Sequence, residues 1–188
     1  MKLVLATLAA VLPAASQQIP VKLDTKATQI NFMLGAVLHS VHGIFHLTEG
    51  EFWFDPSSNR AGGELSVDAK SGESGNRSRD SRMATHVLQA NQYPLISFVP
   101  DRIDGKAATS GHSEFSLHGT LSVHGSAHEL AMNVKSDIET DKLNAIAGFN
   151  IPYVQWGMKN PSTLMLRVEQ TVHIEIRAVG RIGTNGQN

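Results

Sequence analysis

The sequence predicts an all-β protein, an eight-stranded antiparallel barrel with one short amphipathic helix at its mouth. Three observations lead to this prediction. From residue 21 onward, eight or nine short segments alternate apolar and polar side chains. A period of two is typical of half-buried strands. Hardly any helical pattern separates these segments, which favours an antiparallel sheet that closes on itself. A chain of 188 residues is long enough for one domain with a substantial core.

The alternating segments follow one another in a regular order along the chain. They begin at "QINFML" (29–34) and continue through 36–47, 50–55, 63–69, 114–125, 128–134, 145–151 and 163–178. Turn sequences such as "DPSSN" (55–59) lie between them. We expect the following side chains to face the interior: Phe32, His39, Phe45, Phe52, Phe54, Val67, Phe98, Phe115, Leu117, Leu121, Val123, Leu130, Met132, Phe149 and Trp156.

The stretch from Gly75 to Phe98 interrupts the alternation. Within it, Met83, Ala84, Val87 and Leu88 fall on one face of a helix of about three turns. Ser78 is expected to cap its N-terminus, and the proline at position 94 prevents its continuation. The apolar face of this helix needs a surface to cover, and the mouth of the barrel is the natural place.

The two ends of the chain differ from the alternating region. Residues 1–16 hold a lysine, an apolar run and then small residues, the order of a secretory signal peptide. The run is too short to span a bilayer, which takes about 20 apolar residues. The sequence therefore predicts export to the periplasm or the extracellular space, a barrel domain over 21–178, and a polar tail over 179–188.

Composition excludes several classes of function. The formal net charge of −1 provides no basic field for nucleic acid or an anionic membrane. Without cysteine there is no thiol chemistry, iron–sulfur cluster or cysteine-based zinc site. Neither a nucleophile elbow nor a phosphate-binding glycine loop is present, which disfavours an enzyme. We expect no cofactor. Oligomeric state stays open, a homodimer included.

Nine histidines raise the question of a metal site. His39 and His42 face opposite sides of a strand, and His42 and His46 would stand roughly 13 Å apart along it. These spacings argue against a shared ion, so we expect no metal. His39 shares the apolar phase of its strand. It is either a core histidine bonded to a neighbour or a polar contact for a ligand head group.

Three arginines, Arg77, Arg79 and Arg82, flank the start of the predicted helix. Such a cluster is either a solvated surface paired with nearby acids or a site for a polar head group such as a diphosphate. Guanidinium groups suit the second role because they donate paired hydrogen bonds to phosphate oxygens.

Two motifs resemble the YceI-like family of polyisoprenoid-binding, lipocalin-like proteins. The first is "NRSRDSRMATHVLQANQYPLISF", through Arg79–Asp80, Tyr93–Pro94, Ile96 and Phe98. The second is the hairpin "LHGTLSVHGSAHELAMNV", and the resemblance extends from about Val21 to Ala178. The chain departs from the family where "PYVQWGM" replaces the usual "R-x-x-F-G", and where "DTKATQ" replaces "D-x-x-H-S".

The resemblance implies a lipocalin-like eight-stranded barrel with a long apolar lumen. It also implies an exported carrier of an isoprenoid quinone, a prenyl phosphate or a similar lipid. Two alternatives remain. One is a barrel filled by its own side chains that acts through its surface in stress or interaction. The other is an enzyme on a lipid or quinone with His39 as acid or base.

Overall fold

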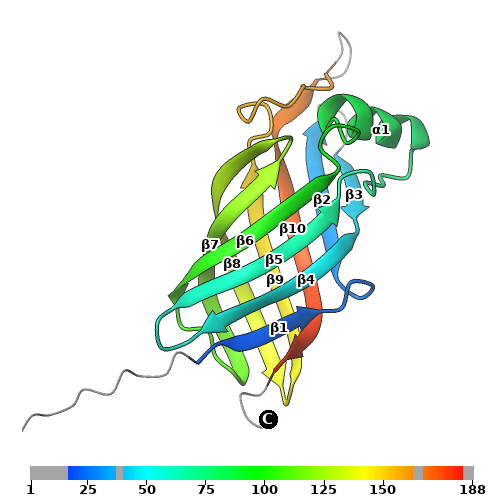
Figure 1. Ribbon diagram of the computed structural model, residues 1–188. Helices are drawn as coiled ribbons and strands as arrows, with labels where there is room; N and C mark the ends of the chain where they lie inside the picture. The colour runs from blue at the N-terminus through cyan, green and yellow to red at the C-terminus, as the bar shows by residue number, and fades with distance from the viewer. Residues whose placement is uncertain (1–16, 37–39, 163–166, 184–188) are drawn as a thin grey trace, which may run out of the picture.

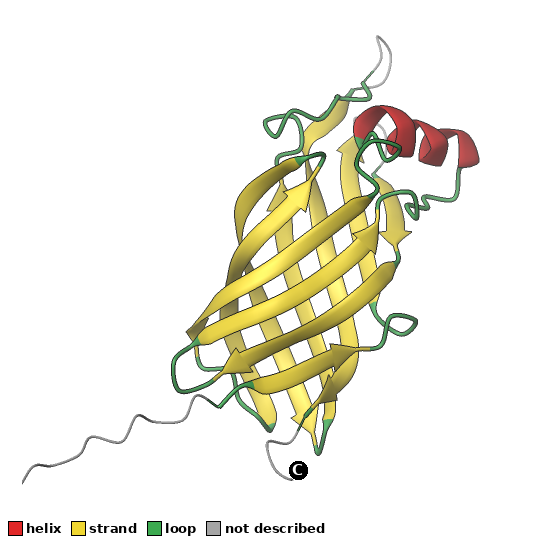
Figure 2. Cartoon of the chain, in the orientation of Figure 1, coloured by secondary structure: helices red, strands yellow, loops and turns green. Residues whose placement is uncertain are grey.

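The computed structural model of the chain describes residues 17–36, 40–162 and 167–183. It is mostly β, with 62% strand, and forms a closed eight-stranded antiparallel barrel with one short helical segment of 11 residues (Figure 1, Figure 2). The fold predicted from the alternation is thereby confirmed. The strands are β1 (Ile19–Leu23), β2 (Gln29–Ala36), β3 (Val41–Phe45), β4 (Leu47–Asp55), β5 (Arg60–Asp68), β6 (Leu95–Gly105), β7 (Gly111–Val123), β8 (Ser126–Glu139), β9 (Lys142–Ile151) and β10 (Val168–Ile182).

The ten strand segments form an eight-stranded barrel because two of the barrel's strands are each broken into two segments. β1 and β2 both pair with β10, one after the other along its length. β1 and β2 therefore form one broken strand of the barrel. β3 pairs with β2 and β4 pairs with β1, so β3 and β4 form the second broken strand. The remaining strands pair with their neighbours in chain order. The result is an up-and-down barrel that closes where Val21 lies opposite Ile182. β10 therefore continues into the residues expected to form a polar tail.

The "DPSSN" turn forms as its sequence predicts and joins β4 to β5. Asp55 is 1% exposed, and its carboxylate accepts hydrogen bonds from the Ser57 backbone N–H and from the hydroxyls of Ser57 and Ser58. An aspartate that binds the backbone two residues on is a common way to build a turn. Asn59 completes the reversal with a positive φ of 56°.

The helical segment comprises α1 (Arg77–Arg82) and a π-helical turn, η1 (Met83–Val87). Its N-cap is Asn76, whose side-chain oxygen accepts from the Arg79 backbone N–H at 3.1 Å. The expectation that Ser78 caps this helix is thus wrong by two residues. Either residue type serves as a cap, and the sequence alone does not choose between them. No helix of the described chain, this segment included, is long and apolar enough to cross a membrane.

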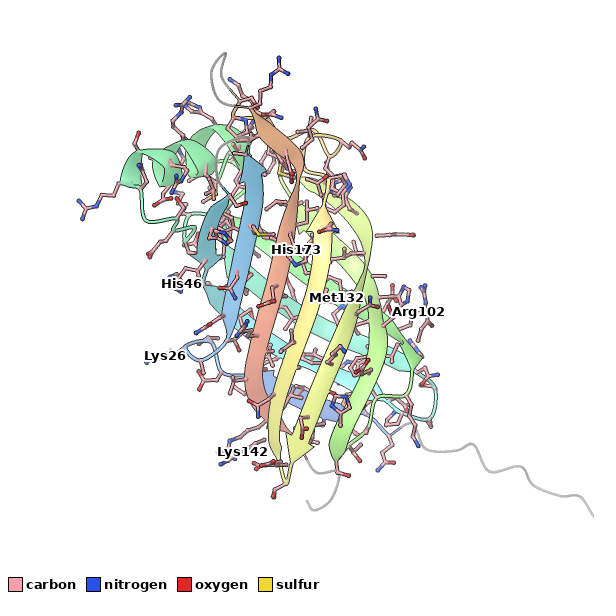
Figure 3. The ribbon with its side chains drawn as sticks, turned by 180° about the vertical axis from the view of Figure 1, so that it is seen from behind. Lys26, His46, Arg102, Met132, Lys142 and His173 are labelled. Atoms are coloured by element: carbon pink, nitrogen blue, oxygen red, sulfur yellow. The ribbon has the colours of Figure 1, made fainter. Side chains whose placement is uncertain are left out.

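The interior has a filled end and a hollow end. At the end away from α1, inward side chains of several strands meet across the barrel. Phe54, Leu117, Val134, Ile138 and Leu143 are all buried there. The outer surface carries charged side chains such as Arg102 and Lys142, which Figure 3 shows projecting from it and which are exposed, together with exposed apolar ones such as Ile146. The filled end supplies the core, and the hollow end, under the helix, contains the candidate site.

Candidate functional site

A cavity of about 480 Å³ occupies the end of the barrel beneath the helix. Its volume falls within the range of small-molecule sites, roughly 300–1,000 Å³. Most of its lining consists of apolar side chains from the barrel strands and the helical segment. Few polar groups lie deep inside it; among them, the Thr28 hydroxyl donates to the Val179 carbonyl at 3.2 Å. Such a cavity suits a chain with few polar atoms.

Many residues expected to face the lumen line this cavity. They are Phe32, Phe45, Val67, Phe98, Leu121, Val123, Leu130, Met132 and Phe149. Each lies on a strand in the apolar phase of its alternation. Phe32 and Phe45 also contact each other, with ring centroids 5.4 Å apart. Their contact with a ligand stays a prediction.

Five other expected lumen residues lie elsewhere. Phe54 and Leu117 are buried in the filled end, and Phe52 and Phe115 pack against the same core. Along the strands, the cavity ends before it reaches these four residues. In β7, for example, Leu121 lines the cavity and Leu117 does not. Trp156 instead stacks on His128, with ring centroids 3.9 Å apart and planes 3° apart. His39 lies outside the described residues.

Other residues that line the cavity were not named as site residues from the sequence. On the strands they are Leu23, Ile30, Leu34, Ala36, Val41, Leu47, Leu65, Ile96, Ser97, Ile151, Val168, Val172, Ile174 and Ile176. The same alternation marks most of them. Tyr153 and Met158 come instead from the connection after β9 and carry no periodic signal. The Tyr153 hydroxyl donates to the Glu169 carbonyl at 2.7 Å, and burial raises the pKa of this phenol above its ordinary value.

The helical segment covers the mouth of the cavity, as its amphipathic pattern predicts. Met83, Val87 and Leu88 line the cavity from above, whereas Thr85 and His86 are exposed. Beside the helix, a strap of residues 71–74 lies against β3. Ile44 and Glu73 exchange backbone hydrogen bonds of 2.8 and 2.9 Å. Gly43 allows this close approach, since a Cβ there would stand 2.3 Å from the Glu73 carbonyl oxygen.

A polar group of residues completes the mouth. Ser74, Asn76, Ser78, Arg79 and Arg82 line the cavity. Arg77 does not line it; Arg77 and Arg82 are both exposed, and Arg79 is half-buried. The structure therefore divides the three arginines that the sequence presents as one cluster: successive helical residues point in different directions, so only two of the three reach the cavity.

The histidines are dispersed over the barrel. His118 lies 2.7 Å from a carboxylate oxygen of Asp104, and His173 lies 2.9 Å from the side-chain oxygen of Asn150. His46 stands 3.8 Å from Glu73 at the strap. Within the described ranges, no three histidine or carboxylate side chains gather as a metal site requires. Metal independence stays a prediction that needs a test in solution.

A closed up-and-down barrel with an apolar cavity under a helical cover is the architecture of a class of small binding proteins. Comparison with known proteins identifies the family within this class. The model of the YceI-like domain family matches residues 21–180, so the chain belongs to that family. No curated protein matches the chain in sequence.

Solved structures share the fold at low sequence identity. Burkholderia cenocepacia BcnA is 16% identical with a TM-score of 0.68, and the match covers 84% of this chain and 98% of that one. A polyisoprenoid binding domain from Saccharophagus degradans, implicated in plant cell wall breakdown, is 15% identical with a TM-score of 0.68 over 87% and 98%. The YceI protein of Campylobacter jejuni is 13% identical with a TM-score of 0.56 over 97% and 94%.

Proposed function

We propose that this protein is an exported, non-enzymatic carrier that holds the chain of a lipid, such as an isoprenoid quinone or a prenyl phosphate, in its barrel cavity. The observation that carries the proposal is the cavity of about 480 Å³, apolar along the strands and covered by a helix. Membership in the YceI-like family supports it, as does the fold it shares with a polyisoprenoid binding domain.

The energetics of such a site favour a chain over a compact polar substrate. Apolar surface removed from water contributes about 25 cal/mol per Å². A flexible apolar chain gains this term along its whole length in the cavity. A compact polar substrate would leave many of its hydrogen-bonding groups unsatisfied against side chains such as Phe98 and Met132, at a cost of roughly 1–3 kcal/mol each.

The direct test is to identify what the protein contains. The full chain is purified under native conditions without detergent and extracted with organic solvent, and the extract is analysed by mass spectrometry. We expect a lipid with a long apolar chain in near-stoichiometric amount. Delipidated protein should then take up the same lipid. A barrel that contains none and takes up none would support the alternative, a ligand-free interaction protein.

Export is tested separately. The order of charge, apolar run and small residues at positions 1–16 predicts a mature chain that begins near Gln17. N-terminal sequencing of the protein from its natural host, with fractionation of the cells, gives the answer. A chain that retains Met1 in the cytosolic fraction would contradict export and leave the carrier role intact.

A further inference from the structure

The charged groups at the cavity are all of one sign. Among the described residues that line it, the charged side chains are Arg79 and Arg82, and no carboxylate takes part. The other polar residues at the mouth, Ser74, Asn76 and Ser78, bring hydroxyl and amide donors. The cavity is therefore amphipathic, with an apolar body under a cationic, donor-rich mouth.

Arg79 is held in a fixed position by the strap. Its Nε donates to the Ser74 hydroxyl oxygen and its Nη2 donates to the Ser74 carbonyl, both at 2.7 Å. Ser74 is in turn fixed by Asp80, whose Oδ1 accepts from the Ser74 backbone N–H at 2.9 Å and from its hydroxyl. Nη1 of Arg79 makes no hydrogen bond within the described chain. The guanidinium of Arg79 is thus oriented before a ligand binds, and the N–H groups of Nη1 remain available as donors.

Arg82 supplies charge that the protein does not neutralise. Asp80 offsets part of the charge of Arg79 through Ser74, but no carboxylate of the described residues lies within ion-pairing distance of Arg82. From Lys70 to Arg82 the chain has four basic and two acidic residues, a net charge of +2 in a protein of net charge −1. The nearby Glu73 is exposed and faces His46.

We infer that the cavity takes an amphiphile with an anionic head group, a phosphate or a carboxylate, bound at the mouth by Arg79 and Arg82. This inference rests on the proposed carrier function and narrows it. A neutral head group such as a quinone would accept hydrogen bonds there but would leave the cationic mouth without a counter-charge. An anion satisfies the donors and the charge together, and charge-assisted hydrogen bonds are about twice as strong as neutral ones.

The test compares ligands that share a chain and differ in charge. Farnesyl phosphate, farnesol and farnesoate are titrated separately into delipidated full-length protein, with the dissociation constant measured by calorimetry. We expect farnesyl phosphate to bind at least about tenfold more tightly than farnesol, the ratio given by one additional charge-assisted hydrogen bond. The preference should shrink as salt screens the exposed part of the site. The relative affinities of farnesyl phosphate and farnesoate then assign the head group as phosphate or carboxylate.

Matched variants locate the effect. Arg82→Gln should reduce the affinity for farnesyl phosphate by about tenfold and leave farnesol unchanged, because it removes one charged partner. Arg77→Gln makes the same change in charge on the same helix, at a residue that does not line the cavity, and should have less than about a threefold effect. Arg79→Lys keeps the charge but loses the fork that binds Ser74, and should fall between wild type and Arg82→Gln.

Equal affinity for farnesyl phosphate and farnesol would overturn the inference and leave the carrier function standing. Equal losses in Arg82→Gln and Arg77→Gln would also overturn it, because attraction would then come from the general charge of the helix. If none of the three ligands binds, the proposed carrier function itself fails.

Discussion

Two leucines on one strand allow a direct test of whether the cavity is open in solution. Leu117 and Leu121 both point inward from β7 and are 7% and 5% exposed. Leu121 lines the cavity, whereas Leu117, whose cross-strand partners are Ile103 and Met132, does not. Substitution of each by tryptophan adds the same volume to two environments that differ in free space. The pair therefore separates open lumen from packed core with a matched chemical change.

The expected magnitudes follow from the packing. Leu117→Trp forces additional atoms into a filled core, which costs about 1–3 kcal/mol of the free energy of unfolding. For a chain of this size that lowers the Tm by about 2–4 °C per kcal/mol. Leu121→Trp places its ring in the cavity, and the delipidated variant should stay within about 0.5 kcal/mol of wild type. The same ring shortens the space for a chain.

Two measurements check this prediction. Denaturant unfolding of delipidated proteins gives the stabilities, and mass spectrometry of copurified lipid gives the chain length. Leu121→Trp should contain a shorter lipid or none, and the outward-facing Ser122→Trp should contain the wild-type lipid. Equal destabilisation by Leu117→Trp and Leu121→Trp would mean that the cavity is closed in solution, and the reasoning from its lining would fail.

Three further predictions concern the cover, the strap and metals. Val87→Asp places a carboxylate on the cavity side of η1 and should lower the free energy of unfolding by roughly 1–3 kcal/mol, whereas the exposed His86→Asp should not; equal stability of the two by urea titration would place Val87 in solvent. Ile44→Cys with Glu73→Cys should form one disulfide in a chain that otherwise has no cysteine, since a hydrogen-bonded antiparallel pair has a Cα separation of about 5.5 Å. If the strap moves to release ligand, the oxidised form should lose ligand more slowly than the reduced form in a dilution assay, and equal rates would assign release to another route. EDTA should leave the Tm unchanged, and a drop restored by zinc would contradict the interpretation of the histidines.

The alternation in the sequence was sufficient to predict the side of the sheet on which most strand residues lie. Phe32, Leu121 and Met132 face inward because they occupy the apolar phase of their segments, and a strand directs successive side chains to opposite faces. The amphipathic spacing of Met83 and Val87 likewise predicted a helix with one covered face. Both patterns are local, so they can be found in one sequence without its partners.

Depth within the barrel could not be predicted in the same way. Phe54 and Leu117 show the same alternation as Phe98 and Leu121, yet the first two fill the core and the last two line the cavity. Whether an inward side chain packs against another one depends on the register of all eight strands of the barrel. It also depends on the total volume of the side chains that lie at the same height along the barrel axis. Trp156 illustrates a second limit, because its stacking on His128 joins residues from two separate segments.

The sequence by itself determined a β-barrel with a helical cover and a basic segment at the start of that cover. Only the tertiary structure decided that the hollow end lies beneath the helix and that Arg79 and Arg82, without Arg77, line it. It also brought Ser74 against Arg79 and Asp80 through the fold of the strap. The physical reason is that periodicity records which face of an element is apolar, whereas a cavity and its charged mouth arise from empty space between elements, which no single element encodes.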